Sequence, residues 1–144
     1  ASQTIGYDKL NQLRHIKFFG NIDGLLAHMA KHAAILQPKF AMVADTLQRE
    51  LGDLGCAEWT NPQGGYFMSF NTWPGLAKKV VAMCKEAGVE LTGAGATYPH
   101  GIDKEDKNIR IAPSMPSLED LRQAAELFCL CVKLASVEKL LTEK

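Results

Sequence analysis

The sequence has no net charge, no long apolar run and few cysteines, and each absence argues against a class of protein. Sixteen Lys and Arg residues balance sixteen Asp and Glu residues, so the chain lacks the basic excess typical of a nucleic-acid-binding protein. No stretch of about 18 uncharged apolar residues is present, and we therefore expect no membrane-spanning helix. With 47% hydrophobic residues, the composition is not that of a disordered chain. The 144 residues suit one compact domain, with or without an appended element.

The four cysteines do not indicate a disulfide framework or a metal site. Cys56, Cys84, Cys129 and Cys131 are scattered, and the last three lie in apolar segments of helical pattern. Cys129 and Cys131 would point about 200° apart around a helix, so they could not bind one ion together. We interpret all four as small hydrophobic side chains in a reducing, cytoplasmic compartment.

The hydrophobic pattern predicts a helical first third followed by a mixed α/β remainder. Apolar residues recur every three or four positions in the helical segments, and aromatic or β-branched residues mark the strands. Pro38 lies inside the second helical pattern, where we expect a kink or a junction of two helices. The expected elements are helices at 8–19, 22–51, from Pro74 to 87 and from Leu118 to about 141, strands at 57–59, 65–70, 89–91 and 108–112, and a loop at 93–107.

Three short motifs resemble functional sites but lack the partners that such sites need. His28 and His32 are one helical turn apart, as in helical zinc sites, but no general-base Glu and no evident third ligand accompany them. We interpret them as exposed or capping histidines and expect no metal site. Ser136–Lys139 matches a Ser-x-x-Lys pattern on expected exposed turns, without the other motifs of penicillin-binding enzymes. Gly93–Gly95 lacks the third glycine and the following helix of a dinucleotide-binding loop.

Arg110 is the polar residue that is hardest to explain by structure alone. It alternates with Ile109 and Ile111 on a strand that ends at Pro113, so its side chain lies on the opposite face from theirs. A guanidinium group binds a carboxylate in a planar, bidentate manner that lysine cannot reproduce. The pattern leaves two interpretations open: a solvated or structurally paired arginine, or the carboxylate anchor for a small acidic substrate.

Five segments together resemble class I pyridoxal-phosphate aminotransferases, in particular the bacterial aspartate aminotransferase-like branch. Three of them are similar to the family as a whole: Pro62–Ser69 (PQGGYFMS), Glu86–Thr92 (EAGVELT) and Asn108–Ser114 (NIRIAPS). Two are closer to the bacterial branch: Lys9–His15 (KLNQLRH) and His32–Phe40 (HAAILQPKF). The resemblance covers nearly the whole chain.

The resemblance implies an α/β (α+β) fold, with a helical connector at residues 1–51 and a small C-terminal domain at 52–144. That domain would contain a small mixed sheet packed by two helices, as in fold-type-I enzymes. Arg110 matches the arginine that binds the substrate α-carboxylate, and Gly65 and Phe67 match positions near the substrate. The implied reaction transfers an amino group between an amino acid and a 2-oxo acid, with pyridoxal 5'-phosphate as the electron sink.

The sequence also departs from the family pattern. The Schiff-base lysine, the aspartate at the pyridine nitrogen and most phosphate contacts belong to earlier family segments, and none of those motifs is present. Gly93 stands where the branch tends to have proline. The chain begins Ala-Ser-Gln, without methionine or a signal peptide, and we expect a processed chain or a piece of a longer protein. Alone, we expect it to be inactive, with no catalytic residue, bound cofactor or metal.

Three assignments remain open at this stage. The first is the small domain of an aminotransferase that is a homodimer at full length. The second is an aminotransferase-like domain of a pyridoxal-phosphate-binding transcriptional regulator, and the third is a non-catalytic small-molecule-binding module. We expect amino acid or 2-oxo acid ligands in the first case, and no contact of this segment with nucleic acid or membrane.

Overall fold

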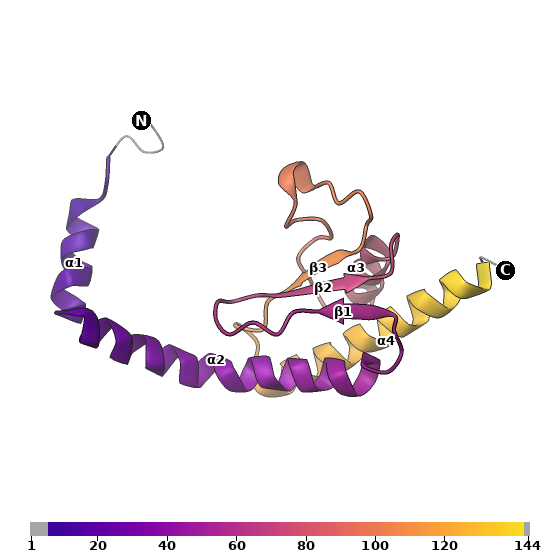
Figure 1. Cartoon of the computed structure of the whole chain (residues 1–144), viewed down its shortest axis with the longest axis horizontal. Coiled ribbons are helices and arrows are strands. Elements are labelled where there is room, and N and C mark those ends of the chain that lie inside the picture. The colour runs from indigo at the N-terminus through magenta and orange to yellow at the C-terminus, as the bar shows by residue number, and fades with distance from the viewer. Residues whose placement is uncertain (1–5, 143–144) are drawn as a thin grey trace. The chain divides into compact units, whose positions relative to one another are not determined.

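The computed structural model describes residues 6–142 (Figure 1). The chain divides into two compact units, residues 1–37 and 38–144, and each is described by itself below. The division falls inside the long helix α2, Ile22–Leu51, which forms as one helix through Pro38. The domain boundary expected after residue 51 stays a prediction.

The first unit contains α1, Lys9–Phe19, and the beginning of α2. The side chain of Asp8 caps α1 by accepting a hydrogen bond of 2.9 Å from the backbone N–H of Asn11. The helix ends at Gly20, as the sequence predicts. Asn21 then accepts a hydrogen bond of 2.9 Å from the backbone N–H of Gly24. A side chain at Gly24 would meet the carbonyl oxygen of Phe19 at 1.9 Å, so the two helices meet closely at this turn.

The second unit contains an antiparallel sheet of three strands: β1 (Ala57–Trp59), β2 (Met68–Thr72) and β3 (Asn108–Ile111). Their order is β1-β2-β3, with Phe70 opposite Trp59 on one side and Ile109 on the other. All three strands were expected, but β2 begins at Met68 and not at residue 65.

Residues 89–91, expected to be a strand, do not form one. The backbone N–H of Val89 donates to the carbonyl of Cys84 at 2.8 Å, so it completes the end of a helix and is not available to a neighbouring strand.

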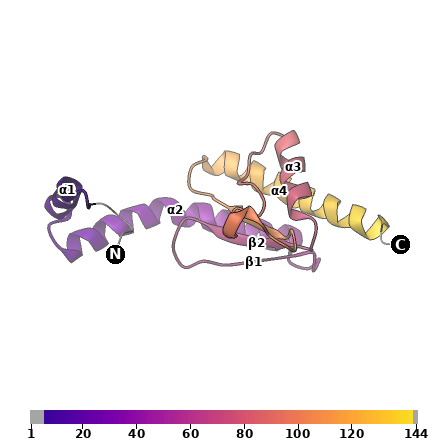
Figure 2. The same ribbon diagram turned by 90° about the horizontal axis from the view of Figure 1, so that it is seen from above.

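Two helices complete the second unit: α3 (Ala77–Glu86) and α4 (Leu118–Thr142). The expected start of α3 at Pro74 was wrong, because Gly75 has a φ of +83° and donates its N–H to Glu105 in a turn. The expected cap of α4 is confirmed, since Ser117 Oγ accepts from the N–H of Asp120 at 3.1 Å. Both helices lie on the same side of the sheet (Figure 2). None of the helices in residues 6–142 combines the length and hydropathy needed to cross a membrane.

The core lies between one face of the sheet and the helices. Met68, Phe70 and Ile109 turn toward it and are at most 1% exposed. They pack with residues that α2, α3 and α4 contribute in turn, among them Val43, Leu47, Leu51, Val80, Cys84, Phe128 and Val132. The expected α/β (α+β) fold class, with a small sheet packed by helices, is therefore confirmed. The sheet was expected to be mixed, but both of its strand pairs in the described residues are antiparallel.

The cysteines are free and buried in this core, which leads to a prediction about their reactivity. Burial raises the pKa of the Cys84 thiol to about 12, and the neighbouring Cys131 adds a smaller increase. Burial likewise raises the pKa of the Cys129 thiol to about 12, with a smaller contribution from the negative charge of Glu50. Because the thiolate is the reactive form, we expect modification by a thiol reagent at pH 8 to be slow in the native protein. Unfolding in urea should expose all four thiols at once; fast titration of Cys84 and Cys129 before unfolding would contradict this.

Candidate functional site

The sheet face that turns away from the core is polar and carries the candidate site. Side chains alternate along β2 and β3, so that Ser69, Asn71, Asn108 and Arg110 share this face. The register places Ser69 opposite Arg110 and Asn71 opposite Asn108. We call these four residues the polar sheet face.

Arg110 is half-buried on the polar sheet face and has no acidic partner. None of the ion pairs formed by residues 6–142 involves it. Its Nη2 donates a long hydrogen bond of 3.4 Å to Thr92 Oγ1, and its Nε is buried without a hydrogen-bond partner. A structurally paired arginine would not show this arrangement, because a buried donor left unsatisfied is unfavourable. The guanidinium group therefore retains capacity for an anion.

Phe67 contacts Arg110 directly, whereas Gly65 does not. The guanidinium carbon of Arg110 lies 4.4 Å from the centroid of the Phe67 ring, within the range of a cation–π interaction. Phe67 is 48% exposed and lies just before β2, at the end of the loop between β1 and β2. Gly65 lies in the same loop with a φ of +87° and open space around it. A side chain at this φ would be strained, so glycine suits the turn before Phe67. A position of Gly65 near a bound substrate stays a prediction.

Asn108 connects the polar sheet face to the loop at 93–107. It is buried, and its Nδ2 donates to Ser69 Oγ at 2.9 Å and to Asn71 Oδ1 at 2.7 Å. Its Oδ1 accepts from Thr97 Oγ1 at 2.6 Å. The network holds β2, β3 and the loop together beside Arg110. The hydrophobic pattern gives no sign of this role of Asn108; its one signal in the sequence is an asparagine within a strand, which is unusual, two residues from Arg110.

Asp103 organises the same loop from within. Its carboxylate accepts from the backbone N–H groups of Lys107 and Asn108, both at 2.8 Å, and from that of Glu105 at 3.1 Å. Burial alone would raise its pKa, but the hydrogen bonds from Asn108, Lys107 and Glu105 outweigh it and the pKa is lowered from 3.8. Gly95, at a φ of +79°, completes the loop where a side chain would meet Gly101 O at 2.9 Å.

The lowered pKa of Asp103 predicts acid sensitivity. A carboxyl group with a lower pKa when folded stabilises the protein above its unfolded pKa, and this stability is lost as the pH falls through the folded value. We expect the unfolding free energy to decrease below about pH 4, near the unperturbed pKa of aspartate. Asp103→Asn should be less stable than the wild type at pH 7 and should lose less stability on acidification. Urea unfolding at several pH values measures both; equal slopes for the two proteins would contradict the prediction.

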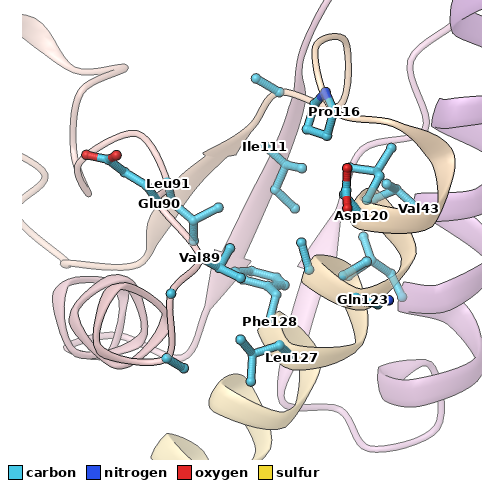
Figure 3. Close-up of a pocket in the computed structure, with 17 residues that line it drawn as sticks. Val43, Val89, Glu90, Leu91, Ile111, Pro116, Asp120, Gln123, Leu127 and Phe128 are labelled. Carbon is cyan, nitrogen blue, oxygen red and sulfur yellow. The ribbon is translucent and has the colours of Figure 1, made fainter.

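A cavity of about 490 Å³ in this unit lies away from Arg110 (Figure 3). It is lined by Ile111, by residues 87–91 and by the first turns of α4, including Leu127 and Phe128. Ile111 points to the core side of the sheet, opposite to Arg110. The walls of the cavity are mainly apolar. Figure 3 shows the Glu90 carboxylate pointing away from Phe128. The guanidinium group is therefore not part of the cavity.

The Ser-x-x-Lys motif and the histidine pair, for which no functional site was expected, have different environments in the structure. Ser136 is buried, contrary to the exposed position expected, and its Oγ donates to the carbonyl of Val132 at 2.8 Å. Lys139 Nζ donates to the carbonyl of Pro74. Among the described residues, no group of three or more His, Cys, Asp or Glu side chains is placed to hold a metal ion. His28 and His32 do, however, contact each other through their Nε2 atoms at 2.9 Å.

Comparison with known proteins gives consistent matches along the chain. The sequence model of the family described as aspartate amino-transferase matches residues 1–144. A Mycolicibacterium smegmatis protein with a provisional aminotransferase name is 50% identical over 144 residues, which are 100% of this chain and 34% of that protein. The crystal structure of an aspartate transaminase from Corynebacterium glutamicum matches with a TM-score of 0.89 at 48% identity, over 94% of this chain and 32% of that chain.

More distant structures share the fold. An α-aminoadipate aminotransferase from Thermus thermophilus, solved in complex with N-(5'-phosphopyridoxyl)-L-leucine, matches with a TM-score of 0.68 at 16% identity. The match covers 79% of this chain and 28% of that chain. Across these comparisons, the chain spans about a third of the length of the proteins it matches.

Proposed function

This chain belongs to the aspartate amino-transferase family, and we propose from that premise that it provides the carboxylate-binding part of an aminotransferase. The reaction would transfer an amino group between an amino acid and a 2-oxo acid. The observation that supports this proposal is the state of Arg110: a half-buried guanidinium with no acidic partner and an unsatisfied Nε. The regulator and the non-catalytic module, considered above, have no comparable support in the matched relatives.

Arg110 has the chemistry that a substrate carboxylate requires. A guanidinium group presents parallel N–H donors that bind both oxygens of a carboxylate, and a charge-assisted pair of this kind is stronger than one between neutral groups. Phe67 on one side and Thr92 at Nη2 restrict the rotation of the group. Arg110 thus orients the substrate, and Thr92 and Phe67 position Arg110. Gly65 contributes through the loop conformation alone.

Pyridoxal 5'-phosphate would supply the electron sink of the reaction, but the polar sheet face does not fit it. The side chains that contact Arg110 and Asn108 are hydroxyl, amide and aromatic groups. These offer no amine for the covalent link that the cofactor needs. We therefore propose that the cofactor is bound by residues in the part of the family's proteins that this chain does not match, about two thirds of their length. The residues described here would bind and orient the substrate.

The proposal is tested by an amino-transfer assay on the full-length protein supplied with pyridoxal 5'-phosphate. We expect transfer from an amino acid to a 2-oxo acid, and little transfer from the matched amine that lacks the carboxylate, such as ethylamine against alanine. Equal rates with the amine would contradict carboxylate binding by Arg110. No transfer from any amino acid would contradict the aminotransferase assignment itself. We also propose that the full-length protein is a cytoplasmic homodimer, as the resemblance implies, and sedimentation analysis tests the dimer.

A further inference from the structure

Two histidines on α2, His28 and His32, contact each other through their ring nitrogens. The proposed aminotransferase function does not involve them. His28 and His32 are four residues apart on one helical face, and their Nε2 atoms lie 2.9 Å apart. His28 is half-buried and His32 is exposed, so a small ion can reach both nitrogens from solvent. We propose that this pair is a binding site for a divalent transition-metal ion, which contradicts our expectation from the sequence.

The surroundings of His28 hold its ring in place. Phe18 and Phe19 contact it edge-on, with ring centroids 5.5 Å and 5.3 Å from that of His28. The rings of His28 and His32 are 4.6 Å apart. A pair that is already oriented loses little side-chain entropy on binding, which favours chelation. The sequence could not show this, because it depends on the turn that brings α1 against the beginning of α2.

The two nitrogens are close enough to bind one metal ion together. With metal–nitrogen bonds of about 2.05 Å, nitrogens 2.9 Å apart subtend an angle of about 90° at the ion. That is the angle between adjacent ligands in square-planar or octahedral coordination, which Cu²⁺ and Ni²⁺ adopt. A tetrahedral Zn²⁺ ion would need a separation of roughly 3.3 Å. Small side-chain rotations would therefore let both nitrogens bind one ion once their hydrogen bond is released, and water would complete the coordination sphere.

Binding requires a change of tautomer but no net loss of a proton. In the contact at 2.9 Å, one ring donates its Nε2–H and the other accepts at Nε2. When both Nε2 atoms bind the ion, the donor ring must carry its proton on Nδ1. Each nitrogen then gives a lone pair to the metal, both rings stay neutral and the hydrogen bond is lost.

The experiment is calorimetric titration of the 144-residue chain with Cu²⁺, Ni²⁺ or Zn²⁺ salts in a non-chelating buffer. We expect one site that binds Cu²⁺ more tightly than Ni²⁺ or Zn²⁺. His28→Gln and His32→Gln should each weaken Ni²⁺ binding roughly 10²-fold, because the chelate is reduced to one ligand. His15→Gln is the matched control: its ring bonds the Asn11 carbonyl through Nδ1 at 2.8 Å and lies outside the pair, so the affinity should change less than about twofold.

The outcomes separate cleanly. Circular dichroism of each variant establishes that the helices are intact before binding is compared. Equal Ni²⁺ affinity in the wild type and His28→Gln would overturn the site. A loss on His15→Gln as large as on His32→Gln would show that the ion does not bind the pair. None of these results depends on amino-transfer activity.

Discussion

Replacing Arg110 with lysine should reduce kcat/KM for amino acid substrates by about 10²-fold in the full-length protein. Each hydrogen bond between a charged donor and a charged acceptor contributes about 1.5–3 kcal/mol, and lysine cannot offer the two parallel donors of a guanidinium group. Lysine also loses the stacking on Phe67 that holds the group in place. Steady-state kinetics with a series of amino acids measures the effect.

Arg122→Lys provides the matched control for this experiment. Arg122 lies on the exposed side of α4 and pairs with Glu119 at 2.6 Å and Glu126 at 3.4 Å. Exposed ion pairs contribute little to stability, so this variant should keep kcat/KM within about twofold. Guanidinium ions added to Arg110→Ala should restore part of the lost activity. Full activity of Arg110→Lys would remove the proposed role of Arg110.

The sequence could predict Arg110 because strand alternation is a local property. A strand that alternates isoleucine with arginine places the arginine on one known face, and the structure confirms that face. Other local patterns predicted the three strands and the cap of α4. These features depend on residues within a few positions of one another.

The surroundings of Arg110 could not be predicted in the same way. The contact with Phe67 depends on the register between β2 and β3, which pairs residues about 40 positions apart. The hydrogen bonds of Asn108 to Ser69 and Thr97 also join distant segments. Residues 89–91 had the composition of a strand, yet the end of α3 used the backbone group that a strand would need. In the first two cases the contacting residues are far apart in the sequence. In the third, a backbone hydrogen bond decides the structure, and the hydrophobic pattern does not report on backbone hydrogen bonds.

The largest loss of stability is expected from Phe70→Ala. Phe70 is 0% exposed, stacks on Trp59 with ring centroids 6.0 Å apart and meets Phe128 edge-on at 4.8 Å. It joins the central strand to α4, so its removal leaves a cavity that the surrounding rings cannot easily fill. We expect the unfolding free energy to decrease by about 3–5 kcal/mol. For a chain of this size that corresponds to a Tm lower by roughly 10–17 °C, measurable by calorimetry.

Phe67→Ala removes the same side chain three residues earlier and serves as the matched control. Because Phe67 is 48% exposed and its contact is the cation–π interaction with Arg110, the loss should be about 0.5–1 kcal/mol. The two variants therefore distinguish the contribution of the core to stability from the contribution of the polar sheet face to substrate binding. Phe70→Ala should lower stability strongly, whereas Phe67→Ala should chiefly weaken the positioning of Arg110 and raise KM. Equal losses of stability would mean that the loop before β2 packs as tightly as the strand itself, and would contradict the exposed position of Phe67 on which the site depends.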